Sequence, residues 1–166
     1  TARKKFRIGR GDFYVKIKPR RNFFALGEDK EIEIRTLTHT GKPVSAKVYV
    51  KLFRYRWKPL QLVYVHDKRP AFAVKVTTDE KGFALVKLPK KFPHYGEFDI
   101  VATSFDRKDN IITASRVIWI CSWDSLKIAS KFKNLELSLD VSRLNKPGEV
   151  TCLVKSRFTD AYICLT

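Results

Sequence analysis

The chain's three histidines, His39, His66 and His94, are its natural candidates for the base of a hydrolytic triad. A triad also needs a nucleophile and a third group that orients the base. His66 directly precedes Asp67, but neighbouring residues of a strand point to opposite faces, which is poor geometry for an orienting pair. The histidines fall in expected turns or strand ends, so we interpret them as surface residues. Since paired carboxylates and a glycine-rich phosphate loop are also missing from the sequence, we predict that the chain is not an enzyme.

The three cysteines, Cys121, Cys152 and Cys164, are the next candidates for chemistry. They show neither a Cys-x-x-Cys pair nor the Cys/His spacing of a zinc site, so we expect no metal and no cofactor. Cys152 and Cys164 could pair if they lie on neighbouring strands. Cysteines inside apolar strands are more often buried thiols, and we favour that interpretation while leaving the pairing open.

Basic and aromatic residues alternate over residues 51–58. This pattern could combine phosphate contacts with base stacking, as in proteins that bind single-stranded nucleic acid. It is also what an amphipathic strand requires, with Phe53, Tyr55 and Trp57 packed inward and the basic side chains in water. We favour the amphipathic strand and keep nucleic acid as the weaker alternative. The candidate surface consists of Lys51, Arg54, Arg56, Trp57 and Lys58.

The whole chain is strongly basic, with 34 Lys and Arg against 17 Asp and Glu and a net charge of +17. Such a field attracts nucleic acid, anionic lipid or acidic proteins. Many basic residues, however, alternate with apolar ones, as in Val15–Lys18, and this places them on the solvent face of a strand. We therefore interpret most of the charge as solvated surface. Arg10-Gly11-Asp12 is the tripeptide that integrins read, but we give adhesion little weight.

Alternating apolar patterns separated by turn residues predict an all-β chain. About seven short strands within 110 residues, without a helical period, are typical of an immunoglobulin- or fibronectin III-like antiparallel β-sandwich. We predict this sandwich over residues 13–122. Its turns should lie at residues 39–43, 79–82, 93–96 and 106–110. Residues expected to contribute to the core are Ile32, Ile34, Val48, Val50, Phe98, Ile100, Val117 and Trp119.

A weak internal repeat points to a second domain. An alternating strand leads to Gly27-Glu28, and a later one at residues 135–140 leads to Gly148-Glu149. Pro147-Gly148 fits the centre of a type II turn, and Leu26-Gly27 could form the same turn. We divide the chain into a basic lead-in (1–12), the sandwich (13–122), a linker (123–130) and the opening strands of a second domain (131–166). The sequence lacks Met, a signal peptide and an apolar run of membrane-spanning length, so we expect a piece of a longer protein.

Several of these motifs, in this order, resemble the macroglobulin-type domains of bacterial alpha-2-macroglobulins, in the stretch that leads into the bait-region domain. The likeness covers about residues 13–166. Its turn residues are Gly27, Glu28, Gly41, Pro43, Asp79, Gly82, Gly96, Asp106, Pro147 and Gly148, and its strand motifs include residues 83–89, 96–102, 115–119 and 135–140. Departures from the family pattern include Leu26 in place of a proline and Arg157 in place of another.

The resemblance implies a periplasmic, cell-envelope or secreted protein that traps endopeptidases, in which this chain is a non-catalytic scaffold module. Its partners would be neighbouring macroglobulin domains, and proteases would be the targets of the parent protein. The family's reactive thioester motif, Cys-x-Glu-Gln, is absent from this sequence. The alternative is a basic immunoglobulin-like binding module, for nucleic acid or as an adhesin.

Overall fold

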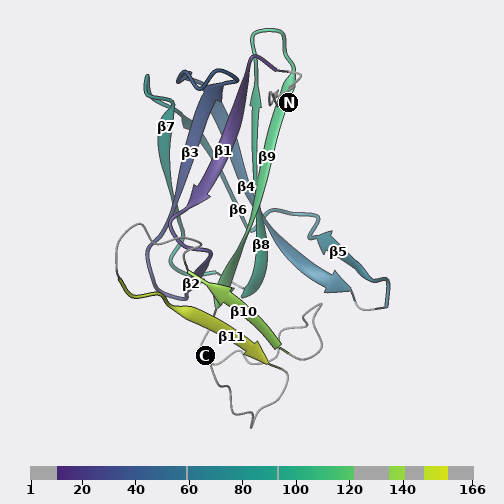
Figure 1. Cartoon of the computed structure of the whole chain (residues 1–166). Coiled ribbons are helices and arrows are strands. Elements are labelled where there is room, and N and C mark those ends of the chain that lie inside the picture. Colours follow the sequence, from purple (N-terminus) through teal and green to yellow (C-terminus); the bar gives the residue numbers. More distant parts are fainter. Residues whose placement is uncertain (1–10, 59, 93, 122–134, 141–147, 157–166) are drawn as a thin grey trace, which may run out of the picture.

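The computed structural model describes residues 11–58, 60–92, 94–121, 135–140 and 148–156, and every regular element within these ranges is a β-strand (Figure 1). The strands, in chain order, are β1 (Phe13–Pro19), β2 (Phe23–Ala25), β3 (Lys30–Thr38), β4 (Lys47–Lys58), β5 (Val63–His66), β6 (Phe72–Thr77), β7 (Phe83–Leu88), β8 (Gly96–Phe105), β9 (Ile111–Cys121), β10 (Leu135–Leu139) and β11 (Cys152–Ser156).

Two sheets form the sandwich. One has the order β1-β3-β7, and the other has the order β2-β9-β8-β4-β5 with β6 also paired to β4. All pairings within these sheets are antiparallel except that of the short strand β2, which runs parallel to β9. The prediction of an all-β, immunoglobulin-like antiparallel sandwich is confirmed.

The core lies between the two sheets and is built from every second residue of the long strands. In β4, for example, Val48, Val50 and Leu52 are completely buried while Lys47, Tyr49 and Lys51 are exposed. Each apolar side chain of this kind stabilises the fold by roughly 1.5–3 kcal/mol through burial. The core cluster consists of Phe13, Val15, Phe24, Ile32, Ile34, Val48, Val50, Leu52, Val86, Leu88, Phe98, Ile100, Ala102, Ile112, Ile118 and Ile120.

Seven of the eight residues expected in the core are buried, six of them at 0% exposure and Trp119 at 6%, and Val117 of β9 is not. Val117 is 39% exposed, so its assignment to the core was wrong. Trp119 is buried, but it alternates with Ile118 and Ile120, which fill the core from the opposite face of β9. The alternation was identified correctly, and its inward phase was not.

Most of the predicted turn residues lie between strands, whereas Gly96 is the first residue of β8. Gly27 has φ +85°, and the N–H of Glu28 donates to the carbonyl of Ala25 across the turn, as a type II turn at Leu26-Gly27 requires. Asp79 accepts a hydrogen bond from the N–H of Phe83 at 2.8 Å. Pro147 lies outside the described residues, so the second type II turn stays a prediction.

Asp106 organises the β8–β9 turn. Its Oδ1 accepts hydrogen bonds from the N–H groups of Lys108 and Asn110, at 2.8 and 2.9 Å, and its Oδ2 accepts one from the side chain of Asn110 at 2.8 Å. These donors, the Asn110 side chain first among them, hold the pKa of Asp106 at about 2. A carboxylate in this position replaces backbone partners that the tight turn lacks.

Gly82 is the most constrained of the glycines in these turns. It has φ +65°, and a Cβ added to it would lie 2.3 Å from the carbonyl oxygen of Thr36. The N–H of Thr36 donates to the carbonyl of Gly82 at 2.9 Å. Behind this contact, the buried hydroxyls of Thr36 and Thr78 lie 2.7 Å apart. The close approach of β3 to the β6–β7 turn therefore requires a residue without a side chain.

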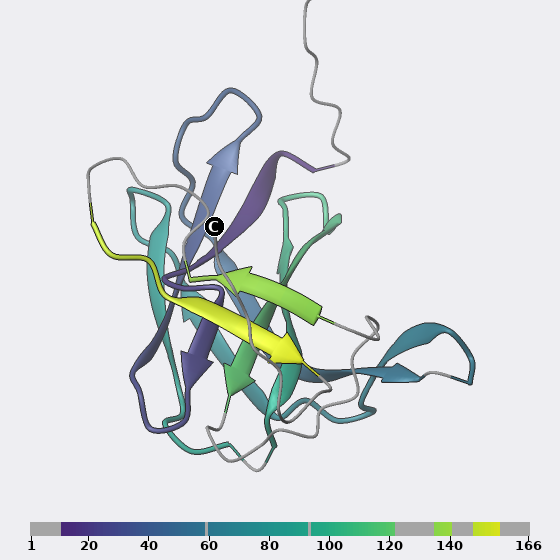
Figure 2. The same ribbon diagram turned by 60° about the horizontal axis from the view of Figure 1, so that its bottom comes forward.

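Strands β10 and β11 form a separate antiparallel pair that lies across the end of the sandwich where β2 lies (Figure 2). Asn22 connects the two parts: its N–H donates to the carbonyl of Asp140 at 3.1 Å, and its side-chain amide donates to the carbonyl of Leu139 at 3.0 Å. The proposed division at residues 122–131 falls outside the described residues and stays a prediction. In the described part of the chain, no helix has the length and apolar character to cross a membrane.

Gly82→Ala tests the constraint in the β6–β7 turn. We expect it to lower the free energy of unfolding by on the order of 3 kcal/mol or more, because it adds a clash with backbone to the strain of a positive φ. Gly41→Ala is the matched control, since Gly41 has φ +87° and open space around its Cβ position. That variant should lose only about 1–2 kcal/mol. Equal losses in chemical denaturation would contradict this account of Gly82.

Candidate binding surface

The distal half of β4 and strand β5 form a hairpin that projects from the side of the sandwich (Figure 1). Strand β4 pairs with β8 only as far as Arg54, opposite Phe98. Beyond that point its partner is β5, with Tyr55 opposite His66 and Lys58 opposite Val63. The hairpin therefore extends past the core, and it needs interactions of its own to hold its shape.

An aromatic ladder along one face of the hairpin supplies these interactions. It consists of rings contributed in turn by β4 and β5, with centroid separations of 5.5, 4.9, 4.6 and 5.0 Å between successive members. The order of the rings is Phe53, His66, Tyr55, Tyr64 and Trp57. Aromatic pairs of this kind stabilise a structure by about 0.5–1.5 kcal/mol each beyond the burial of their surface.

The expectation that Phe53, Tyr55 and Trp57 pack inward was wrong. They lie on the face of β4 opposite Val48, Val50 and Leu52, outside the core cluster, and remain partly exposed. The strand alternates as predicted, but the core-facing positions are the even-numbered ones. The aromatic rings are covered by each other instead of by the opposite sheet.

The basic residues of the candidate surface are divided between the two faces of β4. By alternation Arg54, Arg56 and Lys58 lie on the face opposite the ladder, while Lys51 shares the face of Phe53. Arg56 is further engaged in an ion pair with Asp67. A single nucleic-acid strand lying on either face would meet mainly rings or mainly charges, and the combined stacking and phosphate contact that the sequence allowed is not formed.

Two carboxylates of β8 attach the hairpin to the main sheet. The Nε2 of His66 lies 3.0 Å from Oδ2 of Asp99, and the hydroxyl of Tyr64 donates to Glu97 at 3.4 Å. Asp99 is 7% exposed, and its Oδ1 is buried without a hydrogen-bond partner. Burial raises the pKa of the Asp99 carboxyl, while the charge and hydrogen bond of His66, and to a smaller extent the backbone of Arg116, oppose that rise.

The structure places His66 against Asp99 and not against its sequence neighbour Asp67. The two residues are 33 positions apart, and no spacing rule connects them, so the sequence gave no signal for the pair. The His66 ring is stacked on Phe53 and lies tilted against Tyr55, with interplanar angles of 20° and 49°. The imidazole thus serves as a connection between β5 and β8.

The remaining candidate residues are scattered. A ring nitrogen of His39 lies 2.7 Å from the carbonyl oxygen of Gly11, and His94 is exposed. Cys121 and Cys152 are half-buried, while Cys164 lies outside the described residues, so its pairing with Cys152 stays a prediction. In the parts of the chain that the structure describes, no three metal-binding side chains are grouped together.

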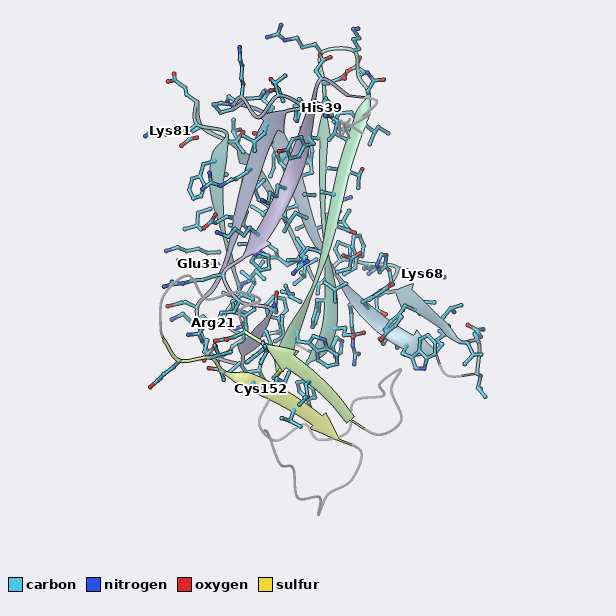
Figure 3. All side chains as sticks on the ribbon, viewed as in Figure 1. Arg21, Glu31, His39, Lys68, Lys81 and Cys152 are labelled. Carbon is cyan, nitrogen blue, oxygen red and sulfur yellow. The ribbon has the colours of Figure 1, made fainter. Side chains whose placement is uncertain are left out.

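On the outer face of the β1-β3-β7 sheet, part of the positive charge is engaged in ion pairs with Glu33 and with Glu31, which is labelled in Figure 3. Glu31 pairs with Arg20 and Lys87 at 3.4 and 3.8 Å, and Glu33 pairs with Arg35 and Lys18 at 3.6 and 4.0 Å. Exposed ion pairs contribute about 0–1 kcal/mol each, so they matter little for stability. They do support the interpretation of this sheet as a solvated, charged face.

No protein-family model matches the chain, and no curated protein matches it either. Among solved structures it is similar to the PmoD soluble domain from Methylocystis sp. ATCC 49242, with 12% identity over 69% of this chain and 95% of that one and a TM-score of 0.44. It is also similar to latent PorU from Porphyromonas gingivalis (13% identity, 81% of this chain, 15% of that one, TM-score 0.42). A third is the CARDB domain of PF1109 from Pyrococcus furiosus, with 16% identity over 73% of this chain and 100% of that one and a TM-score of 0.37. These likenesses are too distant to carry an argument about function.

Asp99→Asn tests the cost of the buried carboxylate. Because folding raises the pKa of Asp99, the folded state binds this proton more tightly than the unfolded chain does, and stability falls as pH rises through the folded pKa. The amide keeps an oxygen for His66 but cannot ionise. We expect the variant to be at least as stable as the wild type at about pH 7, with an advantage that shrinks toward about pH 3. Urea unfolding of both proteins between about pH 3 and pH 7 measures the difference in their free energies of unfolding. A variant that is less stable than the wild type at every pH would contradict the argument.

The separation of rings from basic side chains predicts weak, non-specific binding to nucleic acid. Any DNA or RNA complex should show no sequence preference and should dissociate steeply with added salt, because counterion release alone would drive it. Fluorescence anisotropy with several single- and double-stranded oligonucleotides over a salt series measures this. Tight binding of one RNA sequence at physiological salt would overturn it.

Proposed function

We propose that this chain is a non-catalytic scaffold module of an extracytoplasmic protease inhibitor of the alpha-2-macroglobulin type. The coarser part of this statement, an immunoglobulin-like β-sandwich module, is the observed fold. The finer part rests on the resemblance of its sequence motifs. In this proposal the parent protein is periplasmic, attached to the cell envelope or secreted.

The observation that carries the proposal is the structural use of the motifs that make the resemblance. Gly27, Gly41, Gly82 and Gly96 all have positive φ angles. The Asp79 and Asp106 carboxylates each accept backbone hydrogen bonds that close a turn. Glycines and aspartates of this kind close turns in any β-sandwich, so it is their order and spacing along the chain that support the likeness to the family.

The β10–β11 pair supports the expectation of a neighbouring domain. A two-stranded sheet is at best marginally stable by itself. Here it contacts the sandwich through Asn22, and Leu137 and Leu139 of β10 are each 49% exposed. Apolar side chains on such a pair are suited to packing against further strands. This is the arrangement that tandem sandwich domains in a scaffold would have.

A scaffold role also accounts for the way the polar groups are used. Contacts of His66 with Asp99 and of Tyr64 with Glu97 hold strands together, and the rings of Phe53 and Tyr55 pack against the His66 imidazole. Groups held in this way are suited to fixing geometry. The parent's inhibitory action would then depend on rearrangement of such rigid modules around a protease after cleavage of a bait segment elsewhere.

The proposal predicts different behaviour for the chain and for its parent. Incubated with trypsin, the chain by itself should leave protease activity unchanged and form no covalent adduct at Cys121, Cys152 or Cys164. The parent should abolish trypsin activity toward a large protein substrate while leaving activity toward a small chromogenic peptide, because a cage excludes only large substrates. Stoichiometric inhibition by the chain alone, or a parent that leaves both activities intact, would contradict the proposal.

A further inference from the structure

The tip of the β4–β5 hairpin exposes apolar side chains to an unusual degree. Leu60 is 100% exposed, Leu62 is 73% exposed, and Val63 is 44% exposed. Leu62 also has φ +51°, a conformation that a branched side chain adopts at a cost. Single exposed leucines are ordinary, but a cluster at the end of a projecting element usually marks a surface that contacts an apolar phase.

Contacts with β8 and between its own rings hold the hairpin that carries this tip. The aromatic ladder stacks its two strands together, and the contacts of His66 with Asp99 and of Tyr64 with Glu97 connect β5 to β8. Asp99 is a buried carboxylate kept in place although burial disfavours its charge. A fold that holds a hairpin in this way presents its tip at a fixed angle to the sandwich, and less ordering is required when the tip meets a partner.

The side chains along the hairpin are arranged in layers. Leu60, Leu62 and Val63 form the end, where Lys58 is paired opposite Val63. Trp57 and Tyr64, paired across the strands, form the next level, and Arg56 follows at the level after that. Residues 51–69 contain six basic residues and one acidic residue, which gives +6 − 1 = +5. The basic residues are Lys51, Arg54, Arg56, Lys58, Lys68 and Arg69, and the acidic one is Asp67.

Apart from Lys58, whose long side chain can extend back toward the headgroups, this order matches the layers of a bilayer surface. Leucine partitions into hydrocarbon, Trp and Tyr prefer the interface between hydrocarbon and water, and Lys and Arg are attracted to anionic headgroups. Four residue pairs separate the base of the hairpin from its tip, which is about 14 Å at 3.4 Å per residue. Interfacial elements insert about 5–10 Å, so the tip could enter while Arg56 stays near the phosphates and the long side chain of Lys58 extends back to them.

We propose that the β4–β5 hairpin docks end-on, by its Leu60–Val63 tip, into the surface of a membrane containing anionic lipid. The basic collar provides the charge complementarity, and the apolar tip provides the insertion. A protein partner would have to combine an apolar pocket with a surrounding acidic rim, whereas an anionic bilayer offers both layers in the required order. This inference uses a surface that the scaffold proposal leaves unassigned and stands independently of it.

The test uses the full 166-residue chain. Its sedimentation is measured with vesicles of phosphatidylcholine alone and of phosphatidylcholine with about 30% phosphatidylglycerol, at low and high salt. The variant Leu60→Ser/Leu62→Ser removes the apolar tip, and Leu85→Ser/Ile111→Ser is its matched control, because both of those residues are exposed and lie on β7 and β9. Circular dichroism verifies that each variant is folded.

A second pair of variants tests the collar. Lys58→Glu/Lys68→Glu reverses charge on the hairpin, and Lys81→Glu/Lys108→Glu makes the same change in net charge on exposed turns of the sandwich; Lys68 and Lys81 lie on opposite sides of the molecule (Figure 3). We expect the wild type to bind anionic vesicles at least tenfold more tightly than neutral ones. The tip variant should lose at least tenfold in affinity for anionic vesicles, because it lacks the apolar side chains that insert. The collar variant should also lose at least tenfold, since each basic residue near the membrane surface contributes about fivefold. The two control variants should lose less than threefold.

Three results would overturn the proposal. Unchanged binding by the tip variant would mean that the net charge alone attracts the vesicles. Equal losses in the collar variant and its control would mean that the hairpin has no special role. Absence of vesicle binding, together with self-association that Leu60→Ser/Leu62→Ser abolishes in analytical ultracentrifugation, would identify a protein surface as the occupant of the tip.

Discussion

The pairing of β4 with three other strands is the constraint on which the rest of the structure depends. Its first half is held between β8 and β6, and its second half pairs with β5. Because side chains alternate along a strand, this register decides at once which residues enter the core and which form the ladder. A slip of one residue would exchange Val48, Val50 and Leu52 for Tyr49, Lys51 and Phe53 and would destroy both.

Two buried charged groups, Lys30 and Asp99, connect other segments to the sheets described above. Lys30 is 1% exposed, and its Nζ donates to the carbonyls of Glu28 and Lys90 at 2.9 and 3.1 Å. Burial lowers the pKa of Lys30, against the opposing influence of Glu28 and Asp29. Asp99 is the counterpart on the other sheet, where burial raises the pKa. Apolar residues could be more stabilising at such positions, but a charge with one fitting set of partners favours one arrangement of the chain.

The alternation of apolar and polar residues was enough to predict the fold class and most of the long strands. It located completely buried residues of β3, β4 and β8, including Ile34, Val50 and Ile100, although it missed Leu52 and Ala102. It failed at Val117 and at the ladder because a period of two defines two faces without saying which one meets the other sheet. It also gave no indication of β5, whose four residues are held mainly by rings from β4.

The contacts that make the hairpin distinctive were beyond sequence reasoning for a different reason. His66 and Asp99 are joined only because β5 folds back along β4 and β8 pairs on its other side. Local propensity carries no information about such a three-strand arrangement. The turns, by contrast, were predicted at the residue level, since Gly82 and Asp106 satisfy backbone requirements that depend on a few neighbouring positions.

The central claim is that the β4–β5 hairpin is an ordered extension of the sandwich, held by its aromatic ladder. Hydrogen exchange of the backbone amides in residues 55–58 and 63–66 tests it most directly, because exchange reports the local opening of paired strands. The account predicts that the paired amides in these segments exchange at least about a hundredfold more slowly than unstructured ones. It also predicts that Tyr55→Ala removes this protection while leaving β8 and β9 unchanged. Exchange of the wild-type hairpin at the rate of an unstructured chain would contradict the account.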